Sequence, residues 1–193
     1  MVTKTASNCF APVKYRDEAY TIAFIDRNKE HIMEIRDNKN MRVAWQIANL
    51  GTKAEKLKLI EVLGSRIADE SDQYGRSMAH ALSRRADDNN QEVQSKIIDV
   101  LGEKIACTAD NNGYTIAHKL AYEGRNEVRY KLIDIFGGRL YEIKDFYGTS
   151  VADTINKCAA EPVKNRMKSV MGKSTKEERK DLAEPRMKES FRS

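Results

Sequence analysis

The sequence predicts an all-α protein built from repeated pairs of helices that stack into a solenoid. Three residue types recur about every 35 residues, which is typical of a stacked repeat. The recurring residues are Asp37, Asp72, Asp110 and Asp145; Ala44, Ala79, Ala117 and Ala152; and Gly64, Gly102, Gly137 and Gly172. Charged residues make up 33% of the chain and aromatic residues only 7%, which favours charged helices over a β-sandwich.

The clearest repeat is the unit at 110–144, which begins DNNGYTIAHKLAYEGRNEVRYKLIDIFG. Its pattern predicts a turn, a first helix, a tight loop and a second helix, with a glycine just beyond the second helix. The same order predicts units at 37–71, 72–109 and 145–172, and an insertion in the loop at 84–91 lengthens the second of them. Asn40 stands where the other units have the turn glycine. Asparagine tolerates a positive φ better than other non-glycine residues, so the substitution is compatible with the same turn.

The second helices predict where the core lies. In the third unit the apolar residues Leu132, Ile133, Ile135 and Phe136 are expected to form one buried strip between neighbouring units. The second unit places Ile97, Ile98, Val100 and Leu101 at the matching positions. In a solenoid such a continuous strip takes the place of a single globular core.

The two ends of the chain are predicted to differ from the repeats. Residues 1–14 read as an extended N-terminal arm, and residues 15–36 read as a short pair of helices that caps the stack. Residues 173–193 are rich in charge, so we expect a mobile tail. No apolar run approaches the ~20 residues of a membrane span, and residues 1–15 lack the apolar segment of a secretory signal.

Cysteine and histidine usage predicts a reduced, metal-free protein in the cytoplasm. The three cysteines, Cys9, Cys107 and Cys158, lie far apart and show no paired spacing. We expect Cys107 and Cys158 to be small buried side chains. The three histidines fall in separate units, so they do not form a metal site. Common catalytic and phosphate-binding motifs are absent from the sequence, which predicts neither an enzyme nor a cofactor.

The third unit resembles the ankyrin repeat. The residues that carry this resemblance are Asp110, Gly113, Thr115, Ala117, His118, Ala121, Gly124, Glu127 and Val128. The second unit keeps Asp72, Gly75, Ser77, Ala79, His80, Glu92 and Val93, and the fourth keeps Asp145, Gly148 and Ala152. The units diverge from the family where Met78 and Ile116 replace its usual proline. The resemblance implies an ankyrin-like helix-turn-helix solenoid, and a generic α-solenoid is the alternative fold.

The resemblance also implies structural roles for the matched residues. Gly75, Gly113 and Gly148 permit the turn, and the following threonine or serine caps the first helix. His80 and His118 are expected to bridge backbone groups of adjacent turns through their two ring nitrogens. A catalytic role would need a nucleophile or acid partner at a supporting spacing, and neither histidine has one.

The resemblance further implies a module that binds a protein partner through its turn tips and first helices, as an adaptor or an inhibitor. Tyrosine and arginine, which dominate interface hot spots, recur at these places. The candidate residues are Tyr74, Arg76, Arg84, Arg85, Asn112, Tyr114, Lys119, Tyr122, Arg125, Phe146 and Tyr147. Alternatively, the rings pack on the neighbouring turns. The sequence leaves the partner and the oligomeric state open.

Nucleic-acid binding is the alternative function. The net charge of +5 and the pI near 9.0 are compatible with phosphate contacts from Arg84, Arg85, Lys119, Arg125 and the tail lysines. The 29 acidic residues are mixed with the 34 basic ones, however, and this mixture is typical of a solvated surface.

Overall fold

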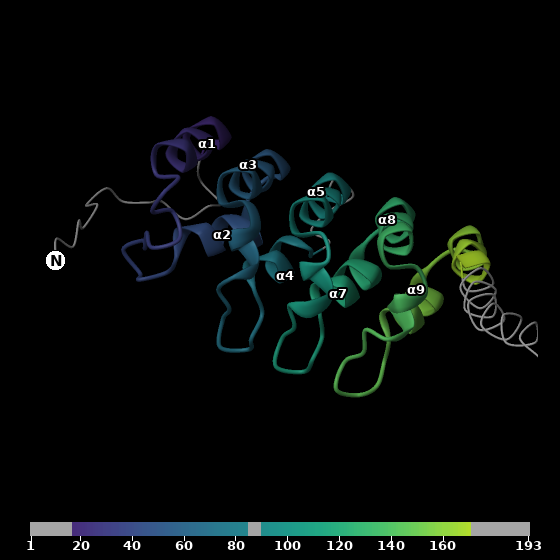
Figure 1. Ribbon diagram of the computed structural model, residues 1–193. Helices are drawn as coiled ribbons and strands as arrows, with labels where there is room; N and C mark the ends of the chain where they lie inside the picture. Colours follow the sequence, from purple (N-terminus) through teal and green to yellow (C-terminus); the bar gives the residue numbers. More distant parts are fainter. Residues whose placement is uncertain (1–16, 85–89, 171–193) are drawn as a thin grey trace, which may run out of the picture. The chain divides into compact units, whose positions relative to one another are not determined.

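The computed structural model describes residues 17–84 and 90–170, and all regular secondary structure in them is helical (Figure 1). The chain divides into two compact units, Met1–Lys104 and Ile105–Ser193. Their boundary falls inside the second predicted repeat. The predicted arm at 1–14 and the predicted tail at 173–193 lie outside the described residues.

The N-terminal unit contains one leading helix followed by two pairs of helices. Its elements are α1 (Glu18–Arg27), α2 (Val43–Leu50), α3 (Lys53–Leu63), the 3-10 helix η2 (Gly64–Ala68), α4 (Met78–Leu82) and α5 (Gln91–Leu101). Helix α3 contacts both α1 and α5, while α2 contacts α4 (Figure 1). Buried aliphatic side chains such as Ile47, Leu59 and Ile97 fill the space between the helices.

The C-terminal unit repeats the same arrangement. Its elements are α7 (Ile116–Glu123), α8 (Asn126–Phe136), the 3-10 helix η3 (Gly137–Tyr141), α9 (Val151–Cys158) and the helical residues 161–170, while the short α6 (Lys104–Cys107) spans the boundary between the units. Helix α7 contacts both α8 and α9. Leu120, Leu132 and Ile155 are completely buried among them.

A turn that begins with aspartate precedes each first helix. We call these the aspartate turns; they lie at 37–41, 72–76, 110–114 and 145–149, before α2, α4, α7 and α9. An isolated antiparallel bridge closes each turn, for example between Ala109 and Thr115. The fourth turn residue has a positive φ in every case, and Asn40, with φ of 62°, adopts the conformation of the glycines as predicted.

The predicted second capping helix is wrong. Residues 28–34 form hydrogen-bonded turns, in which the N–H of His31 donates to the carbonyl of Asn28 and the N–H of Glu34 donates to the carbonyl of His31, both at 2.9 Å. Ile32 is the fully buried side chain of this segment, while its neighbours Met33 and Ile35 are half-buried. A single buried residue gives no apolar face at helical spacing, so tertiary packing does not favour a helix here.

Four positions that were predicted to be buried need correction. Ile135 is 39% exposed and Val100, its counterpart on α5, is half-buried, whereas Leu132, Ile133 and Phe136 are buried as predicted. Since α8 has ~3.6 residues per turn, Ile135 points almost opposite to Ile133. Cys107 is exposed and Cys158 is half-buried, contrary to the prediction that both are buried. Cys107 is the last residue of the short α6, where little of the chain packs over it.

Long polar side chains are buried at matching positions of two second helices. Nε2 of Gln94 donates to the carbonyl of Ser83 at 2.8 Å, just beyond the end of α4. Nε of Arg129 donates to the carbonyl of Ala121 near the end of α7 at 2.9 Å. The last carbonyls of a helix lack partners within the helix, and these side chains supply them. These two second helices, α5 and α8, are therefore each bonded to the end of the first helix of their own pair.

The orientation of α8 predicts unequal effects of two substitutions. Ile133→Ala should lower the free energy of unfolding by ~2–5 kcal/mol, because removal of a buried aliphatic side chain leaves a cavity. Ile135→Ala is the matched control on the same helix and should change it by no more than about 0.5 kcal/mol. Denaturant titration followed by circular dichroism measures both. Equal losses of unfolding free energy would show that the side of α8 that carries Ile133 does not face the core.

Candidate functional site

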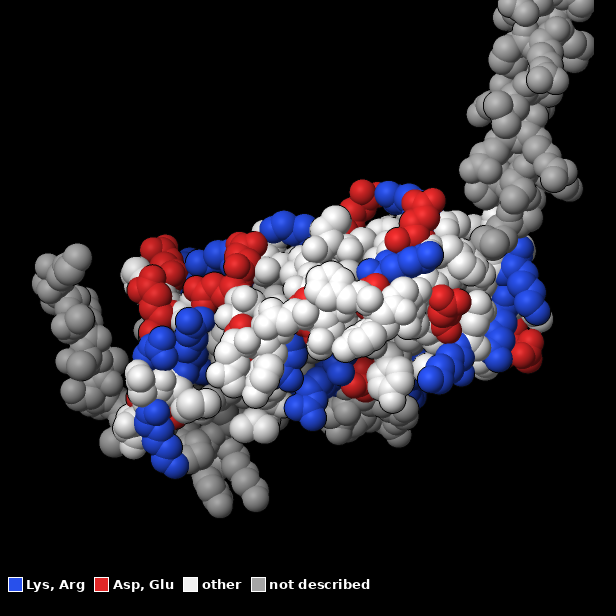
Figure 2. Space-filling model, turned by 90° about the horizontal axis from the view of Figure 1, so that it is seen from below, with Lys and Arg blue, Asp and Glu red and all other residues white. Residues whose placement is uncertain are grey.

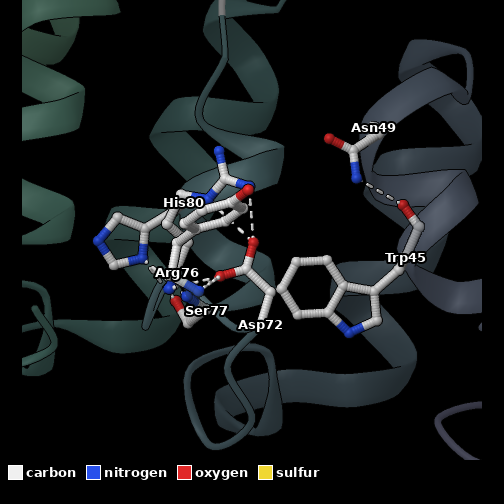
Figure 3. A network of polar contacts seen from close by, with 7 residues as sticks. Trp45, Asn49, Asp72, Arg76, Ser77 and His80 are labelled. Carbon is white, nitrogen blue, oxygen red and sulfur yellow. Dashed lines mark hydrogen bonds and ion pairs between the residues drawn. The ribbon is translucent and has the colours of Figure 1, made fainter. Parts of the chain in front are cut away.

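The aspartate carboxylate holds each turn together from inside. In the turn at 72–76, Oδ1 of Asp72 accepts the backbone N–H groups of Tyr74 and Arg76 at 2.9 and 3.0 Å. Its Oδ2 accepts Nε and Nη2 of Arg76 at 2.9 and 2.7 Å (Figure 3). Burial opposes ionisation of Asp72, but these hydrogen bonds outweigh it and lower its pKa. The backbone of the turn is therefore fixed independently of its outward side chains.

The outward face of this turn carries Tyr74 and Arg76. Tyr74 is 56% exposed, and the guanidinium of Arg76 lies over its ring at 4.8 Å from the centroid. Trp45, half-buried on α2, points toward Asp72 from the preceding pair of helices (Figure 3). The sequence-based candidate list lacks Trp45, although it stands where the later units have His80 and His118 and is the single tryptophan of the chain.

In the C-terminal unit, two aspartate turns are joined by a backbone hydrogen bond. The N–H of Phe146 donates to the carbonyl of Asn112 at 3.0 Å. Phe146 and Tyr147 are nonetheless 79% and 81% exposed, so their side chains face outward. The structure thus brings the candidates Asn112, Phe146 and Tyr147 together.

His118 links these two turns through both ring nitrogens. The N–H of Thr115 donates to its Nδ1 at 3.2 Å, and the Thr115 hydroxyl lies 2.8 Å from the same atom. Its Nε2 lies 3.0 Å from the carbonyl of Thr149 in the next turn. This geometry requires the neutral ring with the proton on Nε2. Burial lowers the pKa of His118, against the opposing effects of the bond to Thr149 and of the carboxylates of Asp145 and Asp110.

Tyr114 belongs to this framework more than to the outer surface. Its ring lies 5.1 Å from that of His118, and its hydroxyl donates to the His118 carbonyl at 3.1 Å. Burial raises the pKa of Tyr114 far above its ordinary value. For Tyr114 the observed geometry is that of the packing alternative.

The remaining candidates differ in their surroundings. Lys119 is half-buried and pairs with Glu123 at 2.8 Å, whereas Tyr122, on the same helix, is 57% exposed. Arg84 and Arg125 are exposed in the loops that follow the first helices α4 and α7. Arg85 lies outside the described residues. Tyr74, Arg76 and Arg84 belong to the N-terminal unit, and the other described candidates belong to the C-terminal unit.

Charges of both signs are mixed on the surface of the protein. Figure 2 shows Lys and Arg side chains interspersed with Asp and Glu and with uncharged groups on the face that it views. Several cations are engaged in ion pairs, including Arg76 with Asp72 at 2.7 Å and Lys104 with Asp69 at 3.1 Å. Across the described residues, acidic and basic side chains are almost equal in number.

Searches for other kinds of site gave no candidate in the described part of the chain. Residues 17–84 and 90–170 contain no group of three or more His, Cys, Asp or Glu side chains that could hold a metal ion. No helix within those ranges is long and apolar enough to cross a membrane. No family model matches the chain, and neither curated proteins nor solved structures gave a significant match. A functional conclusion therefore has to come from the geometry of the aspartate turns.

Acidification should weaken the His118 linkage. In the unfolded chain histidine binds a proton near pH ~6.5, whereas in the folded protein the pKa of His118 is lower. The unfolded state then binds more protons, so the stabilisation is complete above about pH 6.5 and is lost as the pH falls below it. The free energy of unfolding of the C-terminal unit should therefore decrease between about pH 7.5 and pH 5.5.

His118→Asn is the matched control for this prediction. Asparagine can still accept the Thr115 N–H but does not titrate, so the variant should be less stable at neutral pH and less sensitive to acid. His80 is present in both proteins, and the difference between their urea midpoints isolates the contribution of His118. Identical pH profiles would show that protonation of His118 is not linked to folding.

Proposed function

We propose that this protein is a divergent ankyrin-like solenoid that binds a protein partner through its aspartate turns and the adjacent first helices. In this proposal it acts in the cytosol as an adaptor or an inhibitor and catalyses no reaction. One observation carries the proposal: large aromatic side chains stand exposed on turns whose backbone is fixed by internal hydrogen bonds.

Rigid aromatic groups are effective contact residues. Tyr74, Tyr122, Phe146 and Tyr147 are each more than half exposed, which is unusual for side chains of this size. Because the turn backbone is already ordered, association would immobilise only the side chains, and less conformational entropy would be lost. Tyrosine adds a hydroxyl that can pair with polar groups at the rim of an interface.

The proposed surface is narrower than the predicted one. Tyr114 packs on His118, and Lys119 is paired with Glu123, so neither is included as an anchor. Tyr74, Tyr122, Phe146 and Tyr147 remain as principal contacts, and Arg76, which is paired with Asp72, lies over the Tyr74 ring. Asn112, Arg84 and Arg125 are exposed polar residues that could set the orientation of a partner.

The distribution of charged side chains argues against the alternative function of nucleic-acid binding. Phosphate binding draws on clustered Lys and Arg side chains whose counterions are released on association. Here Arg76 is held by Asp72, and acidic groups are interspersed among the basic ones on the face drawn in Figure 2. A steep decrease of affinity with salt, together with retained nucleic acid, would favour that alternative over a protein partner.

The proposal predicts that binding can be removed without unfolding. A variant with Tyr74→Ala, Tyr122→Ala and Tyr147→Ala should keep its circular dichroism spectrum and unfolding midpoint, because all three side chains are exposed. Its affinity for a partner recovered from the native host should fall at least about thirtyfold, since a hot-spot residue contributes ~2 kcal/mol or more.

Tyr20→Ala is the control for this experiment. Tyr20 is 47% exposed on α1 and lies on none of the aspartate turns. Titration calorimetry of parent, triple variant and control against the same partner measures the three affinities. If the folded triple variant binds as tightly as the parent, the aspartate turns are not the binding surface.

A further inference from the structure

The last aspartate turn, at 145–149, presents two adjacent aromatic side chains. Phe146 and Tyr147, which we call the aromatic tip, are 79% and 81% exposed. The next most exposed large apolar side chain among the described residues is Leu50, at 70%. Within the C-terminal unit the turn extends beyond the helices (Figure 1), so the aromatic tip is a projection and not the wall of a groove.

Hydrogen bonds hold the backbone of the aromatic tip. Oδ1 of Asp145 accepts the N–H groups of Tyr147 and Thr149 at 3.0 and 2.8 Å, and the N–H of Gly148 donates to the Asp145 carbonyl at 3.1 Å. The N–H of Phe146 donates to the carbonyl of Asn112 in the preceding turn. These bonds fix the direction in which both rings leave the backbone.

The Phe146 ring is also supported from one side by Gly113. A Cβ atom built on Gly113 would lie 2.6 Å from the ring, which is closer than any real contact of this kind. The absence of a side chain at Gly113 therefore lets the ring rest against the backbone of the preceding turn. A side chain that is ordered before association loses little entropy when it is bound.

The aromatic tip is electrically neutral. The Asp145 carboxylate points into the turn, where backbone N–H groups bind it, and Phe146, Tyr147, Gly148 and Thr149 carry no charge. The turn at 72–76 differs, because there an arginine lies over the exposed tyrosine. Charged groups in a partner would gain little from contact with the aromatic tip, and their desolvation would oppose binding.

We infer that the aromatic tip is an anchor that enters an apolar, uncharged pocket of a folded protein partner. The inference rests on the proposed function and adds to it the chemistry of the partner. A rigid apolar projection needs a cavity to bury both rings, and a short linear peptide cannot supply one. Because Phe146 and Tyr147 carry no charge, their burial makes the association only weakly dependent on salt.

Two double variants distinguish this inference from the broader proposal. Phe146→Ala with Tyr147→Ala should weaken binding of the partner recovered from host extract about a hundredfold. Tyr74→Ala with Tyr122→Ala, which removes exposed rings elsewhere, should weaken it less than about tenfold. The opposite ranking would overturn the anchor and leave the proposed function standing. Two folded variants that both bind like the parent, or an extract from which the parent retains no protein, would overturn both.

The chemistry of the pocket is tested with the same purified partner. Overlapping synthetic peptides that cover the partner's sequence should not bind at the concentrations at which the intact partner does. Raising salt from about 50 to about 500 mM should change Kd by less than about threefold, because no charged pair is formed at the anchor. A peptide that binds like the intact protein would overturn the requirement for a pocket, and a tenfold or larger weakening by salt would overturn its neutrality.

The rigidity of the aromatic tip is measured on the free protein. Backbone amide relaxation at residues 146–148 should give order parameters near ~0.85, as in rigid helices. Values below about 0.6 would show a flexible turn and would overturn the preordered anchor without reference to any partner.

Discussion

Each repeat depends on the carboxylate inside its aspartate turn. In all four turns the aspartate Oδ1 accepts the N–H groups of the second and fourth residues that follow it, at 2.8 to 3.0 Å. A hydrophobic residue at this place would leave inward N–H groups without partners, at a cost of ~1–3 kcal/mol for each group that stays buried. The first helix begins at the same distance after every one of these aspartates, so the carboxylate sets the register of the turn and the helix together.

In the C-terminal unit the third residue of the first helix is His118 on α7 and Asp153 on α9, and the two make different contacts. His118 and Asp153 both accept the N–H of the capping residue before them, at 3.2 and 3.0 Å. Histidine has a second nitrogen, which reaches the Thr149 carbonyl, whereas a carboxylate offers only acceptors. Among the described residues no further aspartate turn follows the one at 145–149. At this place the carboxylate of Asp153, which binds only the capping residue before it, is sufficient.

Sequence periodicity predicted the helices because each repeat keeps the same few requirements. The positive φ of Asn40 and the burial of Ile133 follow from local chemistry and from helical spacing. The exposure of Ile135 could have been read from the angle between residues on α8. The orientation of Tyr114 could not, because it depends on the place of the His118 carbonyl relative to the ring. Exposed and packed aromatic residues occur in similar turn sequences, so the candidate surface needed three-dimensional coordinates.

In the proposed function, the same carboxylate separates folding from recognition. Since the aspartate and the positive-φ residue satisfy the turn, the two residues between them are free to vary, and they are Asn and Lys, Gln and Tyr, Asn and Asn, and Phe and Tyr in the four turns. The first three pairs are mostly polar, and only the last is wholly aromatic. Two exposed rings would not contribute to folding, because solvent still surrounds most of their area. Their presence on a turn that is bonded to its neighbour through Phe146 and Thr149 supports the proposed contact with a partner.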